Sequence, residues 1–434
     1  MDTACGPLTF GQTYLWRDIM NRPRDRWHES NLADAWPIPD TVDYGQARDA
    51  LATIAIRHPA LRTTYDFGDP QAPLQCLHPA GSLPVEILEI PERDVRKFVF
   101  TLAAKPISLH KGYGWSAYVI TRRQVATHFA VVFHHMTADG MGIRILRDEL
   151  VSLLRNPNEP SPAESKYDLI QLAIDQRQKP AQKAKQHAAA RYWDATLATS
   201  SYAPTSGDDV SNSDFPALMV RLRSGRSRAA ASKLADQTRT SVGTVLLTAY
   251  VRAIAEIQDR RSIPLRVYSS NRYEKRWEQC VTTLAQWTPM HINVDTESFG
   301  ELAARLHTAS MLAYLHGMYD PDVIASIRKR YPASVAEVEC VWGVNYFPAT
   351  ASPDHSTAQV EGDGQLTWEI PLRTIGPRFY LRAVDDEEGT WTLQLRTGGV
   401  DRPLASALIQ RVHSDLISEA ARLDPPAAPL NSSR

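Results

Sequence analysis

The chain has 434 residues, of which 43% are hydrophobic and 22% are charged. This composition is ordinary for a globular protein with a sizeable interior and excludes a disordered or fibrous chain. The 48 lysine and arginine residues nearly balance the 49 acidic residues, so the net charge supplies no field that would hold nucleic acid or an anionic membrane.

The four cysteines, at positions 5, 76, 280 and 340, lack C-x-x-C spacing. This pattern favours reduced thiols in the cytosol over a disulfide framework or a zinc site, and we expect no metal. The first residues lack the basic and apolar stretches of a secretion signal, and no run approaches the roughly 18 apolar residues of a membrane span. We therefore expect a cytoplasmic protein without membrane contact.

In the first half, a helix is expected over residues 46–58 and a strand over residues 61–65. Two runs rich in β-branched and aromatic residues, 115–120 and 125–133, flank a polar turn and predict a hairpin. From Gly140 the apolar residues follow helical spacing, and this helix is expected to stop at Asn156-Pro157. The motif discussed below therefore lies at a strand-to-helix corner.

Residues 199–216 are dense in Ser, Thr, Asp, Gly and Pro, which predicts a linker between a lobe of residues 1–198 and a lobe of residues 217–434. The second lobe is expected to begin with a strand over 217–223 and one amphipathic helix over 234–250, and the basic run 221–228 is interpreted as a solvated helix start. The remaining predictions are a strand over 263–268, a hairpin of 378–384 with 391–396, a helix over 403–423 and a frayed tail over 425–434.

The corner carries the sequence His134-His135-Met136-Thr137-Ala138-Asp139-Gly140. Successive side chains on a strand point to opposite faces, so only one histidine can reach a given cavity. We assign the catalytic part to His135 and a supporting part to His134. Gly140 can adopt positive φ or let a group approach its backbone, and its N–H is a candidate oxyanion donor. Taken alone, the heptapeptide also fits a hydrogen-bonded core histidine.

The carboxylate of Asp139 is interpreted as an anchor rather than a base. A buried carboxylate needs a cation or several N–H donors to stay ionised. The expected partner is Arg272, in Ser269-Ser270-Asn271-Arg272, and Arg62 is a candidate for bracing the same loop. Trp115 and Asn345 are weaker candidates for a substrate-contacting wall, for which ordinary packing is an equal alternative.

The heptapeptide has the form HHxxxDG, the signature of condensation domains of nonribosomal peptide synthetases, in the superfamily of chloramphenicol acetyltransferase. Further segments resemble this family in the family's order: 8–16, 57–65, 167–168 with 192–193, 271–272 and 344–346. The resemblance implies an α/β protein of two acetyltransferase-like lobes in a V, with an active-site tunnel between them. Each end of the tunnel would admit one substrate.

The resemblance also implies a free-standing condensation enzyme of secondary-metabolite biosynthesis. It would join an acyl thioester, tethered to the 4′-phosphopantetheine arm of a carrier protein acting in trans, to an amine or alcohol, and would bind no cofactor itself. His135 would act as a base or by positioning. One alternative is an acyl-CoA-dependent acyltransferase of the same superfamily. A second is a non-catalytic recruitment domain, which usually lacks the second histidine or the glycine of the motif.

Overall fold

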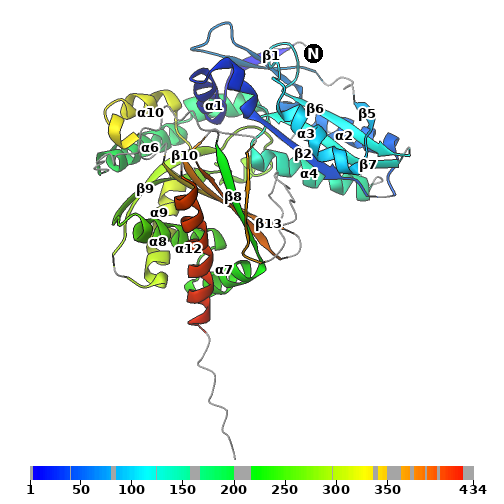
Figure 1. Cartoon of the computed structure of the whole chain (residues 1–434). Coiled ribbons are helices and arrows are strands. Elements are labelled where there is room, and N and C mark those ends of the chain that lie inside the picture. Colours follow the sequence, from blue (N-terminus) through cyan, green and yellow to red (C-terminus); the bar gives the residue numbers. More distant parts are fainter. Residues whose placement is uncertain are drawn as a thin grey trace, which may run out of the picture.

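The structure is a computed structural model, and it describes most of the chain between residues 3 and 423. The described ranges are 3–39, 41–79, 85–123, 125–156, 167–199, 217–295, 297–335, 341–348, 363–371, 376–386, 389–397 and 401–423. Helices and sheets are mixed throughout, as the predicted α/β class requires (Figure 1). The predicted linker, except Thr199, and the predicted frayed tail lie outside the described residues. The predicted lobe boundaries stay a prediction.

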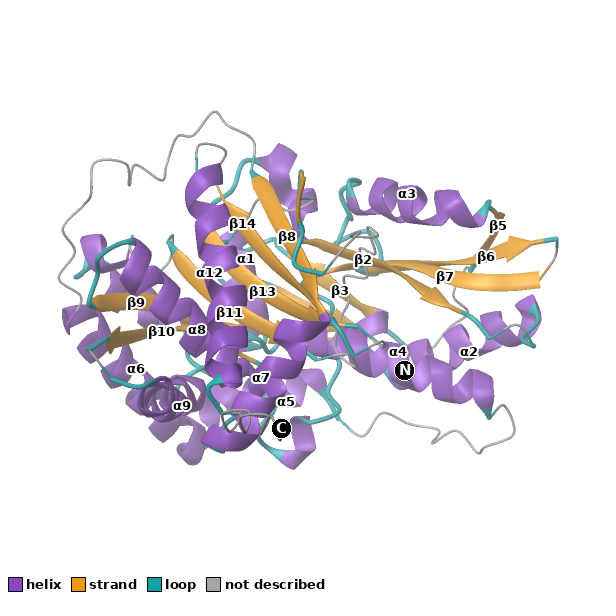
Figure 2. Ribbon diagram, turned by 60° about the horizontal axis from the view of Figure 1, so that its bottom comes forward, coloured by secondary structure: helices purple, strands orange, loops and turns teal. Residues whose placement is uncertain are grey.

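The first half of the chain, residues before 200, is built on a four-stranded sheet in the order β2-β7-β6-β5. Its strands are β2 (Asn31–Pro37), β7 (Val125–His134), β6 (Trp115–Arg122) and β5 (Glu86–Glu89). Helix α3 (Glu92–Ala103) covers one face, and α2 (Tyr44–Arg57) and α4 (Gly140–Arg155) cover the other (Figure 2). The predicted hairpin and the helix after it are confirmed.

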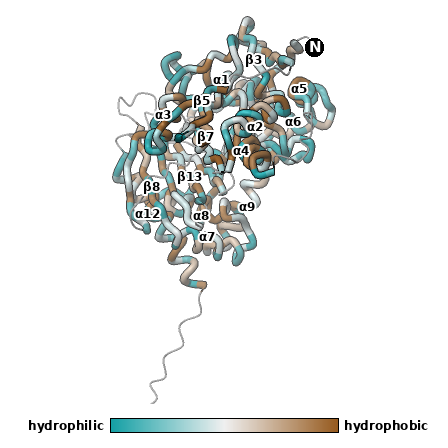
Figure 3. Tube along the Cα trace, turned by 90° about the vertical axis from the view of Figure 1, so that its right-hand side faces the viewer, coloured by the Kyte–Doolittle hydropathy of each residue, from teal (hydrophilic) through white to brown (hydrophobic). Residues whose placement is uncertain are grey.

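Strand β7 is apolar on both sides because helices cover both faces of its sheet. Phe129, Val131 and Phe133 pack toward α2 and α4, whereas Ala130 and Val132 pack toward α3. Brown, hydrophobic stretches alternate with teal along α4 in Figure 3, as expected of a helix with one buried side. This packing fixes both elements that meet at the His134–Gly140 corner.

A small sheet in the order β1-β4-β3 lies beside the first sheet, next to α1 (Phe10–Met20). Its strands are β1 (Ala4–Pro7), β4 (Leu74–Leu77) and β3 (Thr63–Asp66). The remaining elements before residue 200 are η1 (Arg24–Ser30), η2 (Pro59–Arg62), α5 (Leu169–Gln178) and α6 (Pro180–Thr199).

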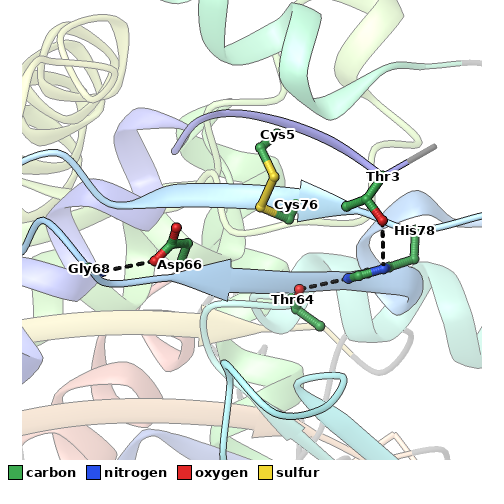
Figure 4. The surroundings of a disulfide bond; sticks show 7 residues. All are labelled: Thr3, Cys5, Thr64, Asp66, Gly68, Cys76 and His78. Carbon is green, nitrogen blue, oxygen red and sulfur yellow. Dashed lines mark hydrogen bonds between the residues drawn. A yellow bond between two sulfur atoms is a disulfide. The ribbon is translucent and has the colours of Figure 1, made fainter.

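A disulfide joins Cys5 and Cys76 in this small sheet, with an S–S distance of 2.03 Å (Figure 4). The prediction that these cysteines are reduced thiols was wrong, because the antiparallel register of β1 and β4 sets the two residues directly opposite one another. Cys280 is a free, buried thiol whose pKa burial raises to about 12, and Cys340 lies outside the described residues. Disulfides persist mainly in oxidising compartments, and the cytoplasmic location stays a prediction.

The second half, residues after 216, is built on a seven-stranded sheet in the order β10-β9-β11-β13-β14-β8-β12. Its strands are β8 (Leu218–Ser224), β9 (Ser262–Ser269), β10 (Gln286–Asn293), β11 (Trp342–Phe347), β12 (Leu366–Glu369), β13 (Phe379–Asp385) and β14 (Trp391–Thr397). Its helices are α7 (Gly225–Thr238), α8 (Val242–Ile257), α9 (Phe299–Leu315), α10 (Pro321–Arg328), α12 (Arg402–Ala421) and the short η3 (Lys275–Trp277).

One face of this sheet carries an apolar core under α7, α8, α9 and α12. The opposite face carries polar and charged side chains, and it looks toward the first half of the chain. Helix α6 packs against β10 and α10 and adds Trp193 to an aromatic cluster with Trp287 and Tyr319. Helix α6, from the first half of the chain, thus packs against elements of the second half.

One expectation for the start of the second half was wrong, and another was only partly right. The single helix over 234–250 is two helices, α7 and α8, bent by 104° at their junction. Arg239 adopts a left-handed φ of 53° after α7, and the Ser241 hydroxyl caps α8. The basic run is a solvated helix start only in its second part, because α7 begins at Gly225 and Arg226 is exposed, whereas Arg221 lies within β8 and is 2% exposed.

No single helix in the described ranges combines the length and the apolar composition of a membrane span; the bent pair α7–α8 reaches them only when the two helices are counted together.

The two halves are joined by a segment of residues 270–286, here named the crossing segment, which leads from β9 to β10. Its residues Trp277, Cys280, Val281 and Leu284 belong to the apolar core of the first half. Helix α1 contacts this segment closely at Gly11, where a Cβ atom would lie 2.4 Å from the Thr283 carbonyl oxygen. The hydroxyl of Thr9, which caps α1, donates to the same carbonyl at 2.9 Å.

Gly11 is therefore required by a close backbone contact, and this requirement can be measured apart from the effect of glycine on helix stability. Gly11→Ala is expected to destabilise the protein by about 1–3 kcal/mol, because a Cβ there overlaps backbone that cannot move freely. Gly45 is a matched control, since it occupies the same position after a capping box in α2 and meets only the Asp43 carboxylate at 3.1 Å. Gly45→Ala is expected to be neutral or slightly stabilising. Denaturant unfolding of both variants checks this, and equal effects would contradict the assignment.

Candidate active site

A cavity of about 1080 Å³ lies between the two halves of the chain, and elements of both line it. The first half contributes residues of α1, β2, α3 and the β7–α4 corner. The second half contributes residues of the polar face of its sheet, of α8 and α9, and of the crossing segment. A pocket of this size, between two sheets and lined by both apolar and polar groups, suits small-molecule substrates.

The backbone of the motif is held from both sides at the end of β7. The His134 N–H donates to the Gly114 carbonyl at 2.7 Å, and the His135 N–H donates to the Ser30 carbonyl at 2.8 Å. The two histidine side chains must then lie on opposite sides of the strand. His135 is half-buried and is one of the residues that line the cavity.

His134 is buried and serves the turn that follows it. Its Nδ1 accepts the Met136 N–H at 3.1 Å, and its carbonyl accepts the Thr137 N–H at 2.8 Å. His135 is held instead through its own carbonyl, which accepts the hydroxyl of Thr283 from the crossing segment. The second half of the chain therefore fixes the backbone that carries the cavity-facing imidazole.

Asp139 is the N-cap of α4 and is 1% exposed. Its Oδ1 accepts the Gly142 N–H at 2.9 Å, and its Oδ2 accepts the Leu284 and Ala285 N–H groups at 3.0 and 2.9 Å. Both oxygens also face Arg272, whose Nη1 and Nη2 each lie 2.9 Å away. Asp139 therefore accepts bonds along the crossing segment and its carboxylate has no room to act as a base.

Burial alone would raise the pKa of Asp139, but the charge of Arg272 and the hydrogen bonds from Arg272, Gly142 and Leu284 outweigh it and hold this pKa below its ordinary value. Arg272 is 8% exposed and also donates to the carbonyls of Cys280 and Thr282 at 3.0 Å. The pair is bidentate and its remaining donors are satisfied, the condition under which a buried ion pair is tolerated.

Gly140 is the first residue of α4 and lines the cavity. Gly140 was expected either to adopt a positive φ or to let another group approach its backbone, and a positive φ is not observed. A Cβ atom there would meet only the ring of Phe347, at 4.0 Å. The absence of a side chain therefore leaves the backbone at the helix start open to a bound molecule.

The other candidates from the sequence lie in different places. Arg62 donates to the His78 carbonyl in the small sheet, so the expectation that it braces the motif loop was wrong. Trp115 is a packing residue, because its indole donates to the Leu61 carbonyl at 2.8 Å and its ring stacks on Phe133. Asn345 does line the cavity, and its amide donates to the Tyr380 hydroxyl at 3.3 Å.

Gln12 and Tyr65 are supporting residues to which the sequence assigned no role. The Gln12 amide donates to the Tyr65 hydroxyl, the Met136 carbonyl and the Thr282 hydroxyl, and Tyr65 itself donates to the Met136 carbonyl at 2.8 Å. Both residues lie in segments that resemble family motifs, and this resemblance was the only feature of the sequence that pointed to them. Among the described residues, no three His, Cys, Asp or Glu side chains are grouped as metal ligands.

Parts of this chain are similar in sequence to parts of large fungal synthetases. The enniatin synthase of Fusarium equiseti is 25% identical over 289 residues, which cover 63% of this chain and 9% of that protein. The cyclosporin synthetase of Tolypocladium inflatum is 28% identical over 207 residues, which cover 45% of this chain and 1% of that protein. The chain thus spans less than a tenth of the length of these curated relatives.

Solved structures establish the fold over nearly the whole chain. The condensation domain of the Monacolin K polyketide synthase MokA superposes with a TM-score of 0.76 at 16% identity, covering 96% of this chain and 98% of that one. The condensation domain that mediates chain release from the enacyloxin polyketide synthase gives 0.75 at 20% identity, covering 98% and 84%. These domains have the chloramphenicol-acetyltransferase-like fold that the sequence predicted.

The family model of the condensation domain matches residues 7–331, three quarters of the chain. Condensation domains work in nonribosomal peptide and polyketide synthesis, where they form bonds to acyl groups that carrier proteins deliver. The match includes the β7–α4 corner, α1 and the crossing segment, which together build the described site. The chain belongs to the condensation domain family.

Proposed function

We propose that this protein is a condensation enzyme that transfers a carrier-bound acyl group to an amine or alcohol, with His135 as the catalytic side chain. The observation that carries the proposal is the position of His135: this residue lines a cavity shared by both halves of the chain, while the nearby Asp139 is fully engaged in an ion pair. A V-shaped pair of lobes with a tunnel open at both ends is part of this proposal.

In the proposed reaction, the acceptor nitrogen or oxygen attacks the thioester carbonyl carbon, the new C–N or C–O bond forms, and the C–S bond breaks. The acceptor loses one proton, and the pantetheine sulfur leaves as a thiol that carries one. His135 accepts the acceptor's proton or hydrogen-bonds to the nitrogen as positive charge develops there. The open backbone at Gly140 is the proposed donor to the developing oxyanion.

The energetic contribution of the enzyme is mainly orientation, because a thioester is already activated. Holding two reactants in line in a water-excluding site lowers a barrier by about 7–11 kcal/mol, whereas a general base contributes about 10²- to 10⁴-fold in rate. In this proposal Asp139 and Arg272 are positioning residues. They keep the corner and the crossing segment together, so that His135 and Gly140 face the same point of the cavity.

The proposed partner is a carrier protein that acts in trans and brings its 4′-phosphopantetheine arm, while the chain binds no cofactor of its own. The proposed setting is a free-standing enzyme of secondary-metabolite biosynthesis in the cytoplasm. The fold and the family match support this proposal. The test below supplies an acyl-loaded carrier protein as the substrate.

Substitution of His135 tests the catalytic assignment. His135→Ala is expected to lower turnover of an acyl-loaded carrier with its acceptor by about 10²- to 10⁴-fold, the contribution of one general base. His128, half-buried on the same strand β7 and outside the cavity lining, provides the control His128→Ala with turnover near wild type. Intact-protein mass spectrometry of the carrier follows acyl loss. Turnover of His135→Ala within a few-fold of wild type would end the assignment.

The same assay separates the proposal from its two alternatives. A steady reaction with soluble acyl-CoA, with no carrier present, would identify a CoA-dependent acyltransferase. Absence of acyl transfer from every loaded carrier, together with specific capture of a tailoring enzyme, would identify a recruitment domain.

Removal of Asp139 is expected to act on stability as strongly as on turnover. Asp139→Ala leaves the Arg272 guanidinium buried without its carboxylate, a change that typically costs about 3–5 kcal/mol. Asp168 is the matched control, since it is also an aspartate N-cap and accepts two backbone N–H groups, but no arginine pairs with it in the described structure. Asp168→Ala should cost about 1 kcal/mol. Denaturant unfolding compares them, and equal losses would contradict the role of the pair.

The pH dependence of stability should report the ionised state of Asp139. The pKa of Asp139 is lower in the folded state than in the unfolded state, so the ionised carboxylate's contribution to stability is present above the unfolded-state pKa and is lost as pH falls through the folded-state pKa. The stability difference between wild type and Asp139→Asn should therefore be constant from pH 7 to about pH 5 and shrink below pH 4. Thermal unfolding of both proteins measures it, and a difference that grows on acidification would refute the ionised pair.

A further inference from the structure

Strand β2 is the terminal strand of the four-stranded sheet, and its outer edge borders the cavity. Four consecutive residues of β2, 31–34, line the cavity. Successive side chains of a strand point to opposite faces of a sheet, so a cavity on one face would meet only every second residue. Helices from both faces also reach the cavity, with Phe100 from α3 on one face and Ile143 from α4 on the other. The cavity therefore follows the edge of this sheet.

The hydrogen bonds between β2 and β7 determine which backbone groups point to that edge. The His135 N–H donates to the Ser30 carbonyl at 2.8 Å. In an antiparallel ladder the bonded pairs recur at every second residue, and the register of β2 with β7 is continuous, so the even-numbered residues of β2 bond to β7. The N–H and C=O groups of Asn31, Ala33 and Ala35 therefore point away from β7, toward the edge.

Ala33 carries the open donor of this edge. The Asn31 N–H donates to the His28 carbonyl, and the Ala35 N–H donates to Oδ1 of Asp34 at 2.9 Å. Within the described ranges, the Ala33 N–H has no hydrogen-bond acceptor, although the residue is half-buried in the cavity lining. A backbone N–H in such a place is satisfied by water or by a bound molecule. The edge thus offers a bound molecule one main-chain donor, with the Ala33 carbonyl beside it as an acceptor.

The two sides of this edge are apolar. Helix α3 lines the cavity with Phe100, Ala103 and Ala104, and helix α4 lines it with Met141 and Ile143. A polar strand edge between apolar sides suits an extended chain in which amides alternate with hydrocarbon groups. A chain of hydrocarbon alone would displace water from the Ala33 N–H without replacing the hydrogen bond, which is unfavourable.

The open donor lies at a defined distance from the proposed reaction centre. His135 is paired with Ser30, and Ala33 lies three residues farther along the chain, or about 10 Å at about 3.4 Å per residue. In a pantetheine thioester the two amide carbonyl carbons are five and nine bonds from the thioester carbon, or about 6 and about 11 Å along an extended chain. The amide farther from the sulfur therefore reaches Ala33 when the thioester is level with His135.

We propose that the edge of β2 binds the pantetheine arm of the carrier-bound substrate as an added strand, in which the Ala33 N–H donates to the carbonyl of the amide farther from the sulfur. This inference deepens the proposed function and rests on it. Strand addition uses main-chain hydrogen bonds, so it recognises the arm whatever acyl group the arm carries. The contact holds the arm extended and thereby sets how far its thioester reaches, at the level of His135.

Amide NMR of the full chain tests the contact directly. The probe is N-pentylpantothenamide, which contains both amides of the arm and no thiol. In protein labelled with nitrogen-15 alanine, the Ala33 and Ala35 signals are identified by their loss in Ala33→Ser and Ala35→Ser. The probe at millimolar concentration should move the Ala33 amide proton downfield and leave that of Ala35 in place, because the Ala35 N–H already donates to Asp34. No shift at Ala33, or equal shifts at both positions, would overturn the proposal.

Proline at position 33 removes the donor and leaves the ladder with β7 intact, because a proline is tolerated at a sheet edge where its missing N–H points outward. Ala33→Pro should weaken binding of the probe about 3- to 10-fold, the contribution of one neutral hydrogen bond. Ala35→Pro is the matched control, since its N–H also points outward but Ala35 does not line the cavity, and it should bind the probe as wild type does. Calorimetry measures both.

Wild-type affinity in a folded Ala33→Pro protein would refute the contact. If this variant lacks a cooperative melting transition, the NMR shift in the wild-type protein decides.

Two further probes separate the possible occupants of the edge. Tetraethylene glycol is a flexible chain without amides, and it should leave the Ala33 signal unchanged; a shift as large as that caused by the pantothenamide would overturn the recognition of amides. N-acetyl-alanyl-alanine methylamide represents a peptidyl substrate. A shift of the Ala33 signal with this peptide and none with the pantothenamide would assign the edge to a peptide chain and overturn the assignment to the arm.

Turnover then separates this inference from the proposed function. Ala33→Pro should raise the KM for an acyl-loaded carrier about 3- to 10-fold, the same factor as for the probe. If the pantothenamide binds at Ala33 but no loaded carrier yields product, the proposed function fails and the binding site on β2 stands. If acyl transfer proceeds with an unchanged KM in Ala33→Pro, the proposed function stands and this inference fails.

Discussion

The ion pair of Asp139 and Arg272 is the interaction on which the rest of the site depends. One carboxylate caps α4, accepts two N–H groups of the crossing segment and receives a bidentate guanidinium from the end of β9. These bonds connect the β7–α4 corner of the first half to the second half. Without its partner, each of these buried charges would cost several kcal/mol.

The same connection explains the distribution of small and polar residues around it. Gly11 has no side chain because the backbone of the crossing segment occupies that space, and Gln12 uses its amide to hold Met136, Tyr65 and Thr282 together. Gly11 and Gln12 do not line the cavity. Gln12 and Tyr65 hold the Met136 carbonyl, and with it the turn between His135 and Gly140, in one conformation.

The two sheets contribute to the cavity in different ways. The four-stranded sheet is covered by helices on both faces and contributes to the cavity part of β2 and the end of β7, which His135 follows. The seven-stranded sheet is covered on one face, so its other face remains available as a wall. Strand alternation then places apolar residues such as Val220 in the core and Arg221 toward the cavity. Residues of both halves of the chain thereby line one cavity.

The sequence by itself determined the local elements and the corner that carries the motif. Hydrophobic period and turn residues correctly predicted the β6–β7 hairpin, α4, β9 and α12, since those signals arise within a few residues of one another. Only the tertiary structure decided which residues that are distant in the sequence contact one another. The disulfide of Cys5 with Cys76, the contact of Arg62 with His78 and the burial of Arg221 in a cavity wall depend on strand register and sheet order. Pairing across such separations is set by the packing of whole sheets, which no local pattern records.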